Sequence, residues 1–96
     1  MPTYILLSKL TDDGAETLRD KPARIREVND EIGKLGAKVV QQFAVLGPYD
    51  FVNIVEAPDN GTIARVSVEL GARGSVQITT LAAIPLDEFI ASLKRG

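Results

Sequence analysis

The β-prone segments of this 96-residue chain are apolar on both of their sides. Successive side chains of a strand point to opposite faces, so a sheet with one face in water alternates apolar and polar residues. Residues 4–7 (YILL), 39–46 (VVQQFAVL) and 51–55 (FVNIV) do not alternate in this way. Helices that cover one face of such a sheet would leave a second, apolar face. The two sides of 39–46 would be Val40, Ala44 and Leu46 on one, and Val39, Phe43 and Val45 on the other.

Amphipathic helices separate and follow these strands. Between 22 and 36, apolar residues recur at helical spacing, with Pro22 suited to the first turn and Gly36 to the end. A shorter helix is expected to begin at Thr11 and to run to about residue 20. The segment 59–71 fits a strand or a helix, and its polar start and terminal glycine favour a helix. A last helix is expected at 85–96, with Leu86, Phe89, Ile90 and Leu93 on its apolar side.

The order of the elements predicts the fold. Strands are expected at 3–8, 37–46, 51–56 and 75–84, which gives β-α-β-β-α-β followed by the C-terminal helix. Right-handed crossovers place the first and third strands side by side, with both main helices on one face. The sequence therefore predicts a single α+β domain over residues 1–96, a ferredoxin-like sandwich with an antiparallel four-stranded sheet. The terminal helix could shield part of the second face and another copy of the sheet could cover all of it, and we expect a homodimer or larger homo-oligomer.

The amino-acid composition excludes several kinds of chemistry. The chain has no cysteine for disulfides, thiolate metal sites or nucleophilic catalysis, and no histidine, the commonest acid or base at neutral pH. Its formal charge is −2, and its basic residues are interspersed with acids, so no stripe for nucleic acid emerges. The first residues lack the features of a signal peptide or membrane span. We expect a cytoplasmic protein with no catalytic residue, metal, cofactor, nucleic-acid partner or membrane partner.

Residues 47–50, GPYD, join two of the apolar strands. Gly47 allows a positive φ, Pro48 presets φ for a turn, and Asp50 can accept hydrogen bonds from nearby backbone N–H groups. A turn does not require Tyr49, whose ring and hydroxyl suit either a ligand pocket or an interface. The candidate ligand-binding or interface residues are Tyr4, Tyr49, Asp50, Asn53, Gln77 and Thr79, with Gln41 as a further polar group of the sheet.

Residues 45–59, VLGPYDFVNIVEAPD, resemble the turn and following strand of the GYD-domain family. The stretches MPTYILLSKLTDDGAETLRDKPARI, LGAKVV and SVQITTLAAI are also similar to that family, so the resemblance covers nearly the whole chain. It implies a ferredoxin-like fold of the dimeric α/β-barrel type, in a family without an established general function. The family often has arginine in the last strand, where this chain has Gln77. The turn is also similar to one in the effector-binding domains of leucine-responsive-type regulators, which dimerise through the same kind of sheet and bind amino acids.

Three functions remain open at this point. The first is a non-catalytic oligomeric module that binds a small molecule or another protein at a subunit interface. The second is a cofactor-independent enzyme like the quinol monooxygenases that share the dimeric α/β-barrel fold, with Asn53, Tyr49 and Tyr4 as its candidate polar groups. The third is a structural assembly subunit whose interface is packed shut. The doubly apolar sheet and the missing catalytic residue types favour the first.

Overall fold

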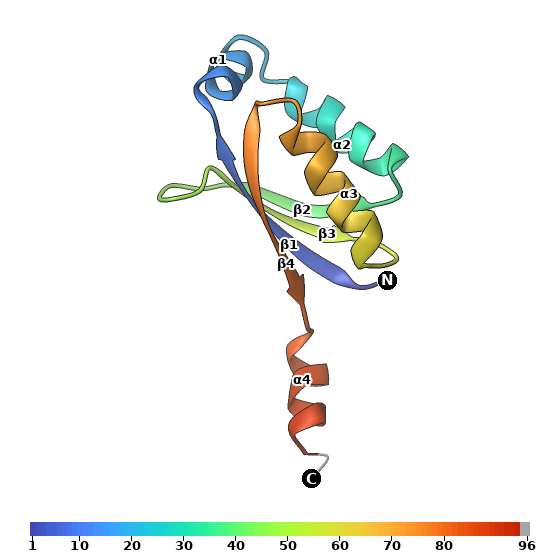
Figure 1. The fold of residues 1–96 in the computed structure, drawn as a ribbon. Helices are drawn as coiled ribbons and strands as arrows, with labels where there is room; N and C mark the ends of the chain where they lie inside the picture. Colours follow the sequence, from blue (N-terminus) through green and yellow to red (C-terminus); the bar gives the residue numbers. More distant parts are fainter. Residues whose placement is uncertain (95–96) are drawn as a thin grey trace.

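The computed structural model describes residues 1–94, which form an antiparallel four-stranded sheet with strand order β2-β3-β1-β4. Helices α2 and α3 lie on one face of the sheet, and α1 lies beyond one end (Figure 1). This is the ferredoxin-like α+β arrangement that the sequence predicts. The elements are β1 (Thr3–Leu10), α1 (Asp12–Asp20), α2 (Arg24–Lys34), β2 (Lys38–Ala44), β3 (Phe51–Glu56), α3 (Asn60–Gly71), β4 (Val76–Ala83) and α4 (Leu86–Leu93).

Helices α1 and α3 begin where a side chain accepts a hydrogen bond from a free backbone N–H group, whereas α2 and α4 have no such cap. The hydroxyl oxygen of Thr11 accepts from the backbone N–H of Gly14 at 3.1 Å, which confirms Thr11 as the N-cap of α1. The ambiguous segment is a helix, α3, and the Asp59 carboxylate accepts from the N–H and the hydroxyl of Thr62, each at 2.8 Å. The backbone hydrogen bond from Thr62 holds the pKa of Asp59 below its ordinary value, because it stabilises the charged form.

The first turn of α1 packs directly against the chain that leads into β4. A Cβ atom at Gly14 would overlap the backbone carbonyl oxygen of Ser75, which accepts a hydrogen bond from the Thr11 N–H at 3.0 Å. Only glycine therefore fits at this position, because the neighbouring atom belongs to the backbone and cannot rotate away.

We expect Gly14→Ala to destabilise the protein by about 1–3 kcal/mol, although alanine is the better helix former. Gly33 in α2 is the matched control, since a Cβ there would meet no heavy atom within 4 Å. Gly33→Ala should stabilise the protein by about 0.5–1 kcal/mol. Urea unfolding of both variants measures the difference. An equal gain in stability from the two substitutions would contradict the close approach of α1 and Ser75.

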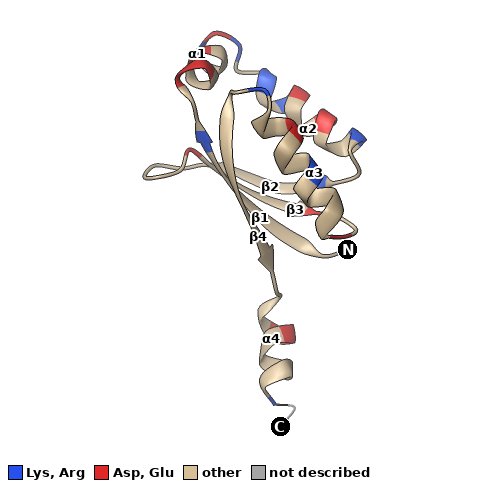
Figure 2. Ribbon diagram, in the orientation of Figure 1, with Lys and Arg blue, Asp and Glu red and all other residues tan. Residues whose placement is uncertain are grey.

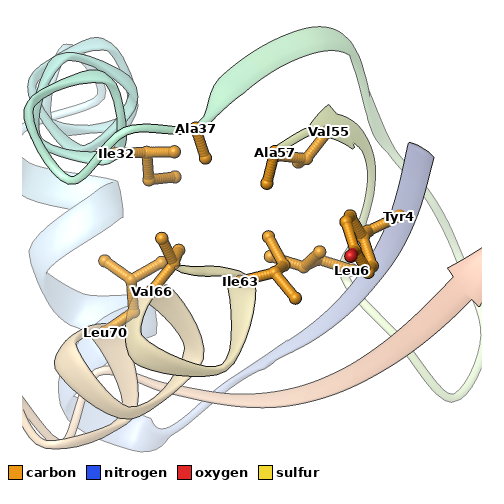
Figure 3. Close-up of a cluster of buried hydrophobic side chains, with 9 residues drawn as sticks. All are labelled: Tyr4, Leu6, Ile32, Ala37, Val55, Ala57, Ile63, Val66 and Leu70. Carbon is orange, nitrogen blue, oxygen red and sulfur yellow. The ribbon is translucent and has the colours of Figure 1, made fainter. Parts of the chain in front are cut away.

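The helix-covered face of the sheet carries the hydrophobic core. Tyr4 and Leu6 of β1 and Val55 of β3 are buried there against α2 and α3 (Figure 3). In the register, Tyr4 pairs with Val55, which places these side chains on one face. The buried apolar residues of this core are Tyr4, Leu6, Ile32, Ala37, Val55, Ala57, Ile63, Val66 and Leu70.

The opposite face of the sheet has no helix on it, and we call it the open face (Figure 1). Its centre is apolar, as the sequence predicts for a sheet with two apolar sides. The apolar side chains form two rows across the strands. One row contains Ile5 with its pairing partners Ile54 and Leu81, and the other contains Leu7 with Val52 and, beyond it, Phe43. The centre of the open face consists of Ile5, Leu7, Val52, Ile54, Phe43 and Leu81, with the polar residues Gln41, Gln77 and Thr79 among them and the charged residues Lys9, Lys38 and Glu56 toward the strand ends.

A β-bulge in β2 corrects one expectation about strand phase. The pairing jumps from Val39–Val55 to Gln41–Ile54, so Val40 is an extra residue. Val39 consequently faces the helices while Phe43 lies on the open face, although strict alternation would put both on one side. The prediction that these two residues share a face is wrong, because the bulge reverses the phase between them.

Helix α4, which could have shielded part of the open face, does not cover it in the single chain. It projects beyond the end of β4, away from the rest of the chain (Figure 1). Pro85 is extended, with φ −54° and ψ 137°, so the chain does not fold back after β4. None of the described residues of α4 is buried. The expected helix continues through Arg95 and Gly96, which lie outside the described residues.

Candidate functional site

The open face brings together two of the six candidate residues. Gln77 pairs with Lys9 and Thr79 pairs with Leu7, so both side chains point to the open face from the edge strand β4. Both are exposed in the single chain. Gln41 lies on the same face, at the opposite edge of the sheet, in β2. These polar groups surround an apolar centre that carries few charges, whereas charged residues gather on α1 and α2 (Figure 2). A surface of this composition suits contact with another protein surface.

The loop after β2 is anchored to the end of β1 by Asp50. Its carboxylate accepts a hydrogen bond from the Leu10 N–H at 2.8 Å, and its own N–H donates to the Ser8 carbonyl at 2.8 Å. The Val45 N–H donates to the Asp50 carbonyl at 2.9 Å and closes the loop. Gly47 has φ +119°, as the sequence predicts for the turn. Asp50 therefore has a structural role, since it ties the loop to the neighbouring strand.

The same loop presents an apolar tip that the sequence reasoning missed. Leu46 is fully exposed, and Tyr49 is half-buried. The sequence predicts Leu46 as the end of a buried strand, but β2 stops at Ala44 and leaves it at the loop tip. The signal available in the sequence is a large apolar residue directly before Gly47 and Pro48, where a turn begins.

Tyr4 and Asn53 lie on the helix-covered face and do not join the open face. Tyr4 is buried, and its hydroxyl donates a hydrogen bond to the Asn60 side-chain oxygen at 2.6 Å, at the start of α3. Asn53 is 8% exposed and donates to the Leu6 carbonyl and to the Ser8 hydroxyl oxygen, each at 3.2 Å. Of the three polar groups considered for oxygen chemistry, Tyr4 and Asn53 thus belong to the sheet, whereas Tyr49 belongs to the loop.

Neither a metal cluster nor a membrane-spanning helix occurs in the described part of the chain. Within residues 1–94, no three or more acidic side chains are grouped so that they could hold a metal ion. The helices of this region are also too short or too polar to cross a membrane.

Comparison with known proteins defines the family of this fold. The sequence model of the GYD domain matches residues 4–93, so the chain belongs to the GYD-domain family. It is 60% identical over 95 residues to a protein of Thermus thermophilus named glutamine synthetase and cystathionine beta-lyase binding protein. That alignment covers 98% of this chain and 100% of the relative. The chain also resembles the crystal structure of TTHA0845 from the same species, with a TM-score of 0.59, 23% identity, and coverage of 88% of this chain and 95% of that one. This second likeness supports the fold.

Proposed function

We propose that this protein is a non-catalytic, homo-oligomeric module that binds other proteins, with metabolic enzymes as its clients. The observation that carries the choice of partner is the relative named for binding two enzymes, which matches this chain over nearly its whole length. The lack of cysteine and histidine agrees with a role without catalysis. The cytoplasmic location expected from the sequence stays part of this proposal.

In this proposal a second copy of the chain covers the open face. The chain carries two apolar surfaces without a partner among the described residues, the open face and the apolar side of α4. In a dimer with twofold symmetry, the open face and α4 of one copy can both contact the other copy, because each copy presents the same two surfaces. Helices as short as α4, with eight residues, are not stable alone in water, so α4 needs a neighbouring surface. Gln77 and Thr79 then lie in or beside the interface between the two copies.

The client enzyme contacts the apolar tip of the loop at residues 45–50. This loop is held in place by the three backbone and side-chain hydrogen bonds of Asp50, so little conformational freedom is lost on binding. Leu46 offers a fully exposed apolar side chain, and Tyr49 lies close to it in the sequence as a half-buried aromatic ring. Anchored apolar and aromatic side chains are typical of the few residues that dominate binding energy.

Binding to purified glutamine synthetase and cystathionine beta-lyase from the same organism as this chain tests the proposal. We expect the wild type to bind at least one of the two enzymes in biolayer interferometry. Leu46→Asp should weaken this binding by about tenfold or more, because it removes an apolar anchor and adds a charge.

The matched control is Val68→Asp on the outer side of α3, where the side chain is 70% exposed. It changes the net charge equally and should leave client binding intact. A wild type that binds neither enzyme would contradict the client class, and full binding by Leu46→Asp would exclude the loop tip as the contact.

A further inference from the structure

A cavity of about 130 Å³, partly open to solvent, lies within the single subunit between the helix-covered face of the sheet and helices α1, α2 and α3. It is separate from the open face and from the loop tip, and most of its wall is apolar. Leu6, Val28, Ile32 and Ile78 belong to this wall. A cavity of about 150 Å³ engineered in another protein is large enough to bind benzene. This cavity is similar in size, so it suits a molecule of about six or seven non-hydrogen atoms.

Asn53 belongs to the wall of this cavity, and its side-chain oxygen has no hydrogen-bond partner among the described residues. Its amide nitrogen donates to the Leu6 carbonyl and the Ser8 hydroxyl oxygen, each at 3.2 Å. Because the Leu6 carbonyl can only accept, the nitrogen must lie on that side, which fixes the orientation of the amide. The amide oxygen of Asn53 is buried and has no hydrogen-bond partner in the described chain, and the residue lines the cavity. A buried polar atom without a partner is rare, because its desolvation is not compensated.

A second acceptor of the same kind comes from α2. Asn29 donates its amide hydrogen to the side-chain oxygen of Gln42 at 2.9 Å, and its own oxygen is buried without a partner among the described residues. Gln42 is the register partner of Asn53 on β2, and all three side chains line the cavity. Two residues with unpaired carbonyl oxygens on the wall of one apolar cavity favour a ligand that donates hydrogen bonds.

The charges at the cavity wall are already compensated. Arg24, at the start of α2, and Arg73, which follows α3, both line the cavity. Both pair with the carboxylate of Glu31. Arg24 also pairs with Glu27 at 2.9 Å. The hydrogen bond from Arg73, followed by that from Arg24, holds the pKa of the Glu31 carboxyl below its ordinary value, so this charge persists at neutral pH. A neutral ligand fits this wall better than a carboxylate or an ammonium ion.

We propose that each subunit binds a small neutral molecule in this cavity, with an apolar body and one hydroxyl or amide group that donates a hydrogen bond to the Asn53 side-chain oxygen. The donor supplies the partner that this oxygen lacks among the described residues. The apolar body fills the space between the sheet and helices α2 and α3. This site is independent of the proposed function, since it uses neither the open face nor Leu46.

Phenol and toluene are the probes that test this site, because both are about as large as the cavity allows and only phenol donates a hydrogen bond. Binding is followed by ¹H–¹⁵N NMR titration of the full chain. We expect phenol to shift amide signals around Asn53 and Val28 and to bind about tenfold more tightly than toluene. Asn53→Leu should abolish this preference, because leucine has a similar size and no acceptor.

Val28→Phe is a second variant that tests the cavity without changing its polar groups. Val28 is a partly buried residue of α2 on the cavity wall, so a larger side chain there fills the space. Both probes should then lose binding while the dispersed NMR spectrum of the fold persists. Equal affinity of the wild type for phenol and toluene, or no saturable binding of either, would overturn the proposal and leave a cavity that only water occupies. Client binding would be unaffected by that result.

Discussion

Leu81→Asp is expected to convert the protein into folded monomers. Leu81 lies on the open face next to Ile5, and its side chain is 44% exposed in the single chain. The edge position of β4 lets an aspartate reach water in a monomer, so the fold tolerates it. In the proposed dimer both copies would bury an unpaired carboxylate in an apolar interface, at a cost of several kcal/mol. We therefore expect the dissociation constant of the dimer to rise at least about hundredfold.

Sedimentation velocity measures this change, and far-UV circular dichroism verifies that the variant is folded. Val68→Asp is the control, because it adds the same charge to an exposed position on α3, away from the open face. The control should sediment like the wild type. If Leu81→Asp keeps the mass of the wild type, the open face is not the interface between copies.

Removal of residues 85–96 is expected to have the second large effect, a weaker association between copies. Because α4 has no buried residue, its loss should leave the body of the subunit folded and its unfolding cooperative. The proposed assembly should weaken by about tenfold to a hundredfold, since apolar side chains of α4 would lose the contact with the partner copy that the proposal assigns to them, at about 1.5–3 kcal/mol for each one fully buried. The mass measured over a dilution series gives the dissociation constant.

A single substitution distinguishes the effect of losing the apolar side of α4 from the effect of shortening the chain. Phe89→Ser should reproduce part of the loss, because Phe89 belongs to the apolar side. Glu88→Gln is the control on the same helix, which removes a charge and keeps the apolar side. An unchanged dissociation constant in both the truncation and Phe89→Ser would show that α4 does not pack on a second copy.

Periodicity and the order of the elements are sufficient to predict the fold. The apolar spacing of α2, the N-caps of α1 and α3, and the sequence of strands and helices all follow from local physical rules. In the segment 59–71, where strand and helix patterns overlap, the capping residue Asp59 decides for a helix, and the structure confirms it. These signals are local, so a single sequence contains them.

The arrangement of the candidate site depends on information that the sequence does not contain locally. When both sides of a strand are apolar, the pattern does not say which side faces the helices, so the sequence groups Asn53 with Thr79 although they point to opposite faces. The bulge at Val40 changes the phase of β2 and is hidden for the same reason. The direction of α4 and the cavity beside Asn53 arise from packing between distant segments, which no short pattern encodes.

The mass of the wild-type protein in solution tests most directly the claim that two copies cover each other's open face. Sedimentation equilibrium at micromolar concentration gives this mass independently of molecular shape. The proposal predicts at least twice the 10.3 kDa of one chain. A mass of 10.3 kDa at this concentration would contradict it, because the open face and α4 would then both remain exposed to water.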